Sequence, residues 1–268
     1  MDASLIRRTG RVLSADIAVP ELDRLRSFYS RILGTGERPL WRDDLNNRCG
    51  VPVIGLGPRT PELELLPLQW LPHIQVADVF ESAQRAVDLG GKELLRGGAT
   101  DGASPWAVLE DPNGAAFGVI PDVSDTVGDS DDVRTRVEEA GRIAWLDLTV
   151  SEATTTSEFY RDVVGWEAQP VAMENEGQRY ADYNMVGADG EAVAGVCHAR
   201  GVNAGLPEVW LLYLPVGDLA ESLRRVREKG GAVVSETRSA DGAIAFATIR
   251  DPVGAYVALA QASPPGAQ

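Results

Sequence analysis

Apolar and polar residues follow two different periods at the start of the chain. Residues 12–19 alternate with a period of two, which is typical of a strand with one buried face. Residues 21–33 place leucine and aromatic side chains at helical spacing, and Gly34 is suited to end that helix. Short strands over 37–41 and 51–56 complete a predicted β-α-β-β-β module.

The same order of elements is predicted for a second module. Gly90-Gly91 ends its helix, and Asp-Pro-Asn-Gly at 111–114 indicates a tight turn before its last strand. The predicted elements are a strand over 71–76, a helix over 79–89, and strands near 93–95, 106–109 and 116–120.

The whole pattern then occurs again. Residues 70–121 and 210–261 align without a gap at an offset of 140 residues, and both contain the Asp-Pro-x-Gly-Ala turn. Upstream, Phe28-Tyr29 matches Phe159-Tyr160 at an offset of 131 residues. Because internal repeats define the architecture of a chain, we expect four modules, of which the first resembles the third and the second resembles the fourth.

Two modules together are long enough for a hydrophobic core of their own, so the chain predicts two domains. The stretch between them is acidic and poor in large apolar residues, as in a solvated linker. The predicted boundaries are an N-terminal domain of modules 1 and 2 (1–121), an acidic linker (122–140), a C-terminal domain of modules 3 and 4 (141–262) and a disordered tail (263–268).

Composition narrows the possible partners and the compartment. A formal net charge of −15 over 268 residues argues against nucleic acid and anionic membranes, because phosphate binding needs clustered lysine and arginine. The two cysteines, Cys49 and Cys197, lie in different halves and suggest no disulfide framework. There is no apolar run of about 20 residues and no apolar leader at the start. We therefore expect a cytoplasmic protein, as a monomer or homodimer.

The motifs together resemble the vicinal oxygen chelate superfamily, which includes glyoxalase I, bleomycin-resistance proteins and extradiol dioxygenases. The Phe-Tyr pairs, the Gly-Gly pairs and the Asp-Pro-x-Gly-Ala turns carry this resemblance over nearly the whole chain. Trp-Leu-Asp-Leu at 145–148 is similar to the tandem two-domain, culture-filtrate-antigen-like "hydroxylase" branch. The resemblance implies an α+β fold: four βαβββ modules paired into two tandem glyoxalase-like domains, each an open β-cup with helices outside.

In metal-dependent relatives, the resemblance places ligands on the first strand of each module and on the strand after Asp-Pro-x-Gly. None of the corresponding residues is a histidine or a carboxylate, whereas a divalent ion needs about three such ligands. We therefore predict no metal and no other cofactor, which argues against glyoxalase, dioxygenase and metal-dependent thiol-transferase activity. The six positions are Ser14, Leu71, Trp145, Leu211, Gly118 and Ala258.

The candidate catalytic residues lie two positions further along the same four strands. Residues two apart share a face of a strand, so Asp16 and His73 in the first half, and Asp147 and Tyr213 in the second, are expected to face the cups. A carboxylate and an ionisable ring in one cup suit general acid–base catalysis. The alternative is that the acids hydrogen-bond neighbouring backbone or an arginine.

Aromatic residues indicate where a ligand would bind. Trp145 occupies a former ligand position and suits stacking on a flat apolar molecule, whereas Trp70 and Trp210 are out of phase and are expected in the core. The predicted substrate-binding residues are Trp145, Trp106, Arg179, Tyr180, Tyr183 and Phe246.

Module 3 is nine residues longer than module 1, with the extra residues inside 173–191. Arg179, Tyr180 and Tyr183 in this stretch either form a wall of a larger pocket or belong to a hairpin with a charged, exposed tip. Cys197 and His198 follow closely, but neighbours in a strand point to opposite faces, so we do not expect a thiol–imidazole pair.

Three hypotheses about function remain. The first is a metal-independent lyase, isomerase or cyclase that acts on a small organic metabolite in secondary metabolism, with the C-terminal domain as the active one. The second is a non-catalytic small-molecule binding protein, or a resistance protein that sequesters a drug, with an aromatic-lined cup for an apolar or aromatic ligand. The third is a structural or signalling module whose cups are filled by its own side chains.

Overall fold

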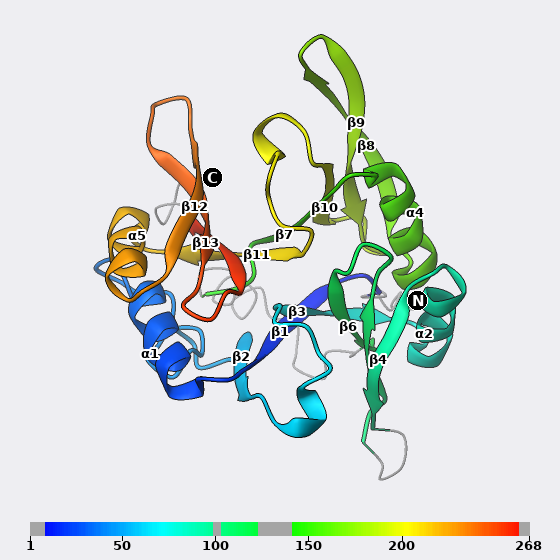
Figure 1. The fold of residues 1–268 in the computed structure, drawn as a ribbon, viewed down its shortest axis with the longest axis horizontal. Helices are drawn as coiled ribbons and strands as arrows, with labels where there is room; N and C mark the ends of the chain where they lie inside the picture. The colour runs from blue at the N-terminus through cyan, green and yellow to red at the C-terminus, as the bar shows by residue number, and fades with distance from the viewer. Residues whose placement is uncertain (1–8, 99–102, 123–140, 263–268) are drawn as a thin grey trace, which may run out of the picture. The chain divides into compact units, whose positions relative to one another are not determined.

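The computed structural model describes residues 9–98, 103–122 and 141–262 (Figure 1). The predicted linker, apart from its first residue, and the predicted tail lie outside these ranges. Within them the α+β fold of four modules is confirmed. Module 1 contains β1 (Val12–Val19), α1 (Leu22–Leu33), β2 (Ile54–Pro58) and the 3₁₀ helix η1 (Pro61–Leu63). Module 2 contains β3 (Leu71–Val76), α2 (Val79–Asp88), β4 (Lys92–Gly97), β5 (Trp106–Glu110) and β6 (Ala116–Pro121).

The second half repeats this order with a longer hairpin. Module 3 contains β7 (Trp145–Val150), α4 (Ala153–Val164), β8 (Glu167–Asn175), β9 (Gln178–Val186), β10 (Ala192–His198) and the 3₁₀ helix η2 (Gly201–Asn203). Module 4 contains β11 (Trp210–Val216), α5 (Leu219–Glu228), β12 (Ala232–Arg238), β13 (Ile244–Arg250) and β14 (Tyr256–Gln261).

Module 1 departs from the prediction in one place. Residues 37–41 form no strand, and only an isolated bridge joins Trp41 to Asn47. The Asn47 side chain accepts hydrogen bonds from the backbone N–H groups of Cys49 and Val51, which holds a turn just after the expected strand. The buried Trp41 donates its indole N–H to the backbone oxygen of Pro215 at 2.7 Å, so this loop packs inward instead.

The described residues form two compact units, and each unit takes one module from each half of the sequence. Unit 1 contains modules 2 and 3 with residues 9–13 and Trp210; unit 2 contains the rest of modules 1 and 4. In unit 1 the strands are ordered β3-β6-β5-β4 and β7-β10-β9-β8, and α2 packs beside α4 (Figure 1). In unit 2 the orders are β2-β1 and β12-β13-β14-β11, and α1 packs beside α5.

A buried chain of hydrogen bonds joins the two modules of unit 1. Trp210 Nε1 donates to Tyr160 Oη at 2.9 Å, and Tyr160 Oη donates to Asp111 Oδ2 at 3.2 Å. The other oxygen of Asp111 accepts the backbone N–H groups of Asn113 and Ala115 within the Asp-Pro-x-Gly turn. Buried polar groups need hydrogen-bond partners. In this chain of repeated residues, each polar group is the hydrogen-bond partner of the next.

Unit 2 contains the same chain in the corresponding residues. Trp70 Nε1 donates to Tyr29 Oη at 3.1 Å, and Tyr29 Oη donates to Asp251 Oδ2 at 2.9 Å. Trp70 and Trp210 are each 1% exposed, which confirms their prediction as core residues. The repeated Trp, Phe-Tyr and Asp-Pro-x-Gly motifs therefore serve the packing of one module on another.

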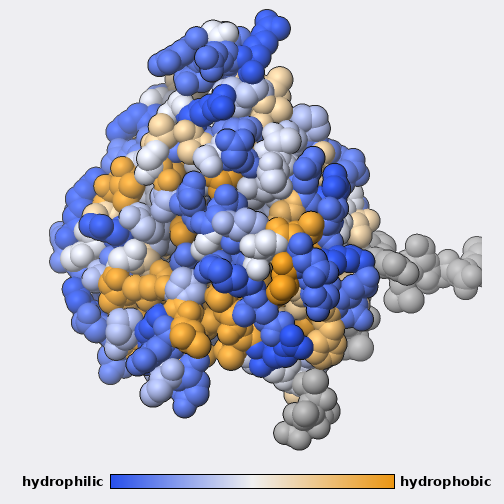
Figure 2. Space-filling view, turned by 45° about the vertical axis from the view of Figure 1, so that its right-hand side comes forward, coloured by the Kyte–Doolittle hydropathy of each residue, from blue (hydrophilic) through white to orange (hydrophobic). Residues whose placement is uncertain are grey.

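The face of the molecule in Figure 2 is mostly polar. Figure 2 shows apolar residues gathered in small patches that charged and polar residues interrupt. Leu65, beside η1, and Val202, in η2, are the most exposed large apolar residues that the structure describes. In the described stretches no helix is both long and apolar enough to cross a membrane.

Candidate functional site on the first strands of the modules

The four predicted catalytic residues occupy equivalent places. In each module the first strand pairs in parallel with another strand, and the residue directly across from the predicted side chain is glycine or alanine. The pairs are Asp16 with Gly55, His73 with Gly118, Asp147 with Gly195, and Tyr213 with Ala258.

Small residues are needed at these positions because the facing side chains lie over them. A Cβ atom on Gly195 would meet Asp147 Oδ1, and one on Gly55 would meet Asp16 Oδ1. A Cβ atom on Gly118 would lie 2.7 Å from His73 Cδ2, closer than real Cβ contacts. The side chains of Asp16, His73 and Asp147 thus fold across the neighbouring strand instead of standing away from the sheet.

Module 3 shows most clearly which face these side chains occupy. Tyr183 Oη lies 2.9 Å from Thr154 Oγ1 of α4, so Tyr183 is on the face that α4 covers. Tyr183 pairs with Val196, and Val196 pairs with the buried Leu148, which places both on that same face. Asp147 alternates with Leu148 and therefore lies on the opposite, half-exposed face.

Trp145 and Asp147 interact directly on this face of β7. Trp145 Nε1 donates to Asp147 Oδ1 at 2.7 Å, and both residues are half-buried. The indole therefore fixes the orientation of the carboxylate over Gly195. A held carboxylate that keeps some exposure is chemically suited to accept a proton from a bound molecule.

Cys197 lies on the same face, because it is two residues beyond Gly195 on β10. Burial, followed by the negative charges of Asp147 and Asp182, raises the pKa of the Cys197 thiol well above its usual range. Since the thiolate is the nucleophilic form, this cysteine stays protonated and is not a candidate nucleophile.

A second acid–base pair in module 3 is not apparent from the sequence pattern. His198 Nδ1 lies 3.2 Å from Asp182 Oδ1, and both residues are buried. The two residues are 16 positions apart and meet only through the pairing of β9 with β10. As expected, His198 does not pair with Cys197; its partner is across the hairpin.

The remaining predicted binding residues are dispersed. Residues 173–191 include a hairpin whose tip, Glu176-Gly177, is exposed, and Arg179 near the tip lies 3.8 Å from Glu174 with its side chain 90% exposed. Tyr180 packs against His198, whereas Tyr183 faces α4. Trp106 lies over Gly97 in module 2.

Phe246 meets one of the predicted catalytic residues in unit 2. Its ring centroid lies 5.2 Å from that of Tyr213, in an edge-to-face arrangement. Both residues are half-buried, on β11 and β13 of module 4, which β14 separates in the sheet. The pair gives that module an aromatic surface.

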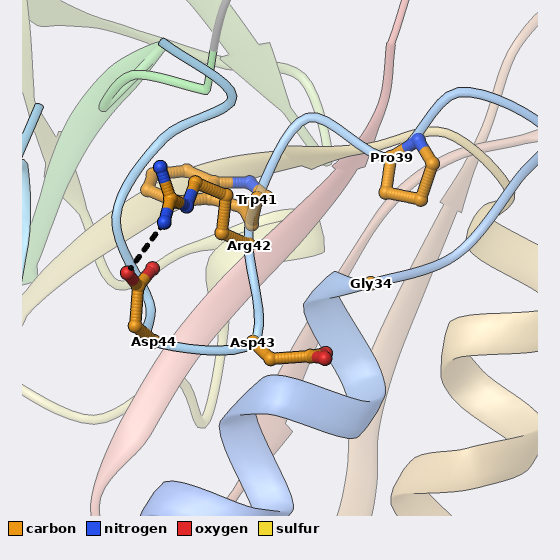
Figure 3. Close-up of a pocket in the computed structure, with 6 residues that line it drawn as sticks. All are labelled: Gly34, Pro39, Trp41, Arg42, Asp43 and Asp44. Atoms are coloured by element: carbon orange, nitrogen blue, oxygen red, sulfur yellow. Dashed lines mark ion pairs between the residues drawn. The ribbon is translucent and has the colours of Figure 1, made fainter. Parts of the chain in front are cut away.

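A separate hollow lies beside the end of α1 in unit 2 (Figure 3). It is lined by Gly34, Pro39, Trp41, Arg42, Asp43 and Asp44. Arg42 is paired with Asp44 at 3.2 Å, and Asp43 accepts a hydrogen bond from Ser30. Each of its charged side chains thus has a partner, and none of the predicted catalytic residues lines it.

Comparison with protein families matches both halves of the chain. Residues 142–259 match the model of the glyoxalase/bleomycin resistance protein/dioxygenase superfamily, and residues 13–120 match that of a glyoxalase-like domain. The chain belongs to this glyoxalase superfamily. The two matches correspond to the two halves that the repeats define.

Members of the glyoxalase superfamily with similar sequences include a full-length relative. "Putative glyoxylase CFP32" of Mycobacterium bovis is 25% identical over 266 residues, which are 96% of this chain and 97% of that protein. "Anthracycline biosynthesis protein DnrV" of Streptomyces peucetius is 27% identical over 131 residues, which are 44% of this chain and 46% of that protein.

Solved structures of dioxygenases share the fold. A variant of homoprotocatechuate 2,3-dioxygenase from Brevibacterium fuscum has a TM-score of 0.56 at 13% identity, covering 100% of this chain and 76% of that one. The 2,2',3-trihydroxybiphenyl 1,2-dioxygenase of Sphingomonas wittichii has a TM-score of 0.51 at 15% identity, covering 96% and 91%.

The residues of this chain do not fit the metal that many members of the superfamily use. Leu71 and Leu211 are buried and, like Gly118 and Ala258, have no donor atom in the side chain. Trp145 uses its indole N–H to hold Asp147. Among the described residues, no three histidine, cysteine, aspartate or glutamate side chains gather as a metal would require. We therefore derive no step through a metal.

Proposed function

We propose that this protein is a metal-independent enzyme that performs acid–base chemistry on a small organic molecule. The observation that carries this proposal is the 2.7 Å hydrogen bond from Trp145 to Asp147 on the half-exposed face of β7. Asp147 accepts a proton from the substrate and returns it at another position, as in an isomerisation, a cyclisation or an elimination. Trp145 is the positioning residue and offers a flat surface beside the carboxylate.

The name of one sequence relative and the residues at the former ligand positions support this proposal. DnrV is named for anthracycline biosynthesis and matches part of this chain, which favours a role in the biosynthesis of a natural product. The donor-poor positions Leu71, Leu211, Gly118 and Ala258 support a reaction without a metal. Asp16, His73 and Tyr213 lie at positions equivalent to Asp147 in the other modules, and we propose acid–base roles for them too.

To test the proposal, protein that has been freed of metal with a chelator is incubated with a library of metabolites. Mass spectrometry then detects any compound that is converted. We expect conversion without added metal, a loss of at least about 100-fold in Asp147→Asn, and a loss of about 10-fold in Trp145→Phe. Asp23→Asn, on the exposed side of α1, is the control and retains full activity. Full activity in Asp147→Asn, or conversion only with a divalent ion, would refute the proposal.

A second candidate function rests on the Tyr213–Phe246 ring pair. An aromatic surface of this kind suits a protein that binds and sequesters a flat ligand without converting it. In that case flat aromatic compounds quench tryptophan fluorescence saturably, Phe246→Ala weakens binding, and the compound is recovered unchanged. Conversion of the bound compound would decide for the enzyme.

A further inference from the structure

The pairing of β9 with β10 ends in a way that creates a second site. The paired residues run only as far as Val196 and Tyr183. Beyond them, the Asp182 carboxylate takes the place of a backbone partner and accepts the backbone N–H of His198 at 2.8 Å. The same oxygen, Oδ1, lies 3.2 Å from His198 Nδ1. One carboxylate therefore fixes both the backbone and the ring of His198.

This contact determines which ring nitrogen of His198 carries the proton. A carboxylate oxygen accepts hydrogen bonds, so Nδ1 is the protonated nitrogen and Nε2 holds the free lone pair. Apart from its contact with Asp182, the imidazole ring of His198 makes no polar contact among the described residues. The one fully enclosed side-chain nitrogen or oxygen without a partner in those residues is Arg59 Nη1. Nε2 of His198 therefore still reaches solvent, although the residue is only 7% exposed.

Two further side chains surround the imidazole. The Tyr180 ring packs edge-on against it, with centroids 5.4 Å apart. The Arg200 guanidinium lies over that same Tyr180 ring, with Cζ 5.3 Å from the centroid. Arg200 is exposed and forms no ion pair with a described carboxylate, although the chain as a whole has a net charge of −15. A proton acceptor and an available cation thus flank one aromatic ring.

We propose that His198, Tyr180 and Arg200 form a binding and proton-transfer site for a small aromatic acid that carries both a carboxylate and a hydroxyl group. Arg200 binds the carboxylate, and Tyr180 contacts the ring of the acid. Nε2 takes the hydroxyl proton: the O–H bond breaks, its electron pair stays on oxygen as a phenolate, and the imidazolium is stabilised by Asp182. The site does not depend on Asp147.

The chain makes a direct test possible because His73 and His198 are its only histidines. Nitrogen-15 NMR of the imidazole rings, assigned with His198→Gln, reports which nitrogen of His198 is protonated. We expect Nδ1–H in the wild type, and a saturable shift of Nε2 when 4-hydroxybenzoate is added. The methyl ester of 4-hydroxybenzoate lacks the carboxylate and should bind at least about 10-fold more weakly.

Variants separate the roles of the residues. Arg200→Gln should weaken 4-hydroxybenzoate binding at least about 10-fold, whereas the exposed Arg161→Gln should leave it unchanged. Asp182→Asn should change the ratio of the His198 tautomers. Asp147→Asn should alter neither the tautomer nor the binding, so this site and the proposed function succeed or fail separately.

Several outcomes would overturn the proposal. A proton on Nε2 in the wild-type protein would do so without any variant. No shift of His198 with 4-hydroxybenzoate, equal binding of the methyl ester, or unchanged binding in Arg200→Gln would also refute it.

Discussion

Asp147 and Gly195 occupy complementary space across two neighbouring strands. The carboxylate lies where a side chain on residue 195 would begin, so the hydrogen bond from Trp145 depends on a glycine there. Gly57, on β2, offers a contrast, because a Cβ atom at that position would meet nothing within 4 Å. The contact with Asp147 therefore requires glycine at position 195, whereas the space around position 57 would also accommodate a larger residue.

We predict that Gly195→Ala lowers the free energy of unfolding by about 1–3 kcal/mol, because the Asp147 side chain must move. Gly57→Ala should leave it unchanged or raise it by up to about 1 kcal/mol, since alanine restricts the unfolded chain. Urea unfolding followed by circular dichroism measures both. Equal effects of the two substitutions would contradict the proposed contact.

Tyr29 and Tyr160 should make stability depend on alkaline pH. Burial, and then the charge of Asp251 for Tyr29 and of Asp111 for Tyr160, raise the pKa of each phenol well above its usual value. In the unfolded chain tyrosine ionises near pH 10. Their contribution is therefore fully present below about pH 10 and is lost as the pH rises towards the folded pKa.

We expect the free energy of unfolding to fall by up to about 1.4 kcal/mol per pH unit for each of these tyrosines above pH 10. A double variant, Tyr29→Phe with Tyr160→Phe, should lose stability at pH 7 but show a shallower decline between pH 9 and 11. Parallel profiles for the two proteins would show that the phenols ionise freely.

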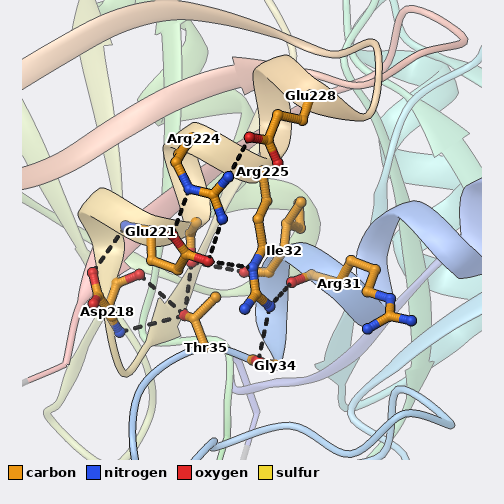
Figure 4. Close-up of polar contacts among 10 residues, drawn as sticks. Arg31, Ile32, Gly34, Thr35, Asp218, Glu221, Arg224, Arg225 and Glu228 are labelled. Carbon is orange, nitrogen blue, oxygen red and sulfur yellow. Dashed lines mark hydrogen bonds and ion pairs between the residues drawn. The ribbon is translucent and has the colours of Figure 1, made fainter.

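At the scale of elements, α1 and α5 are joined by a buried polar contact (Figure 4). Ser222 Oγ donates to the backbone oxygen of Ile32 at 2.7 Å and lies 2.8 Å from Thr35 Oγ1. Arg225 adds a hydrogen bond to the backbone oxygen of Arg31 at the end of α1. The end of one helix thus has its free carbonyl groups satisfied by side chains of the other.

Ser222→Ala should lower the free energy of unfolding by about 1–3 kcal/mol, because it leaves the Ile32 carbonyl without its donor in a buried place. Ser239→Ala, in an exposed turn, is the control and should change it by no more than about 0.5 kcal/mol. Thermal and urea unfolding of both variants give the comparison. A loss in Ser222→Ala as small as in the control would mean that water replaces the contact.

Local periodicity predicted most elements of the fold, but it could not give the contacts between strands. Residues 12–19 and 71–76 were correctly predicted as strands because alternation and flanking turn residues agree. The strand expected over 37–41 was wrong, because the turn built by Asn47 is a side-chain effect without a period. The first strand and helix of module 3 were evident from its repeat, whereas the structure of residues 173–191 was left open.

The candidate site was less predictable for a physical reason. The pairing of Trp145 with Asp147 follows from their spacing of two on one strand. Asp182 and His198 meet only through the register of a hairpin, which the sequence does not reveal. Tyr180 and Tyr183 were grouped together, although an odd spacing already places them on opposite faces of β9.

At the scale of the whole molecule, we propose that the two halves are the units of duplication but do not fold independently. Each buried Trp–Tyr–Asp chain takes its tyrosine from one half of the sequence and its aspartate from the other. The fragment 1–121 contains Tyr29 without Asp251 and Asp111 without Tyr160. Unsatisfied buried groups of this kind are costly, at about 1–3 kcal/mol each.

We predict that fragments 1–121 and 141–262, produced separately, lack cooperative unfolding transitions and that an equimolar mixture regains one. Size-exclusion chromatography and NMR dispersion would follow the recovery of a 1:1 complex. A fragment that unfolds cooperatively by itself, with dispersed resonances, would contradict the prediction and show that a half is a complete folding unit.

The glycine across from His73 also limits which amino-acid substitutions this strand pair can accept. Gly118 stands at a position where metal-dependent relatives are expected to carry a carboxylate, yet a Cβ atom there would lie 2.7 Å from His73. A single replacement of Gly118 by glutamate therefore collides with the histidine, and a smaller residue at 73 alone supplies no ligand. A carboxylate at 118 would therefore need both changes together. For the same reason, an engineer should vary residues 73 and 118, or 147 and 195, as coupled pairs.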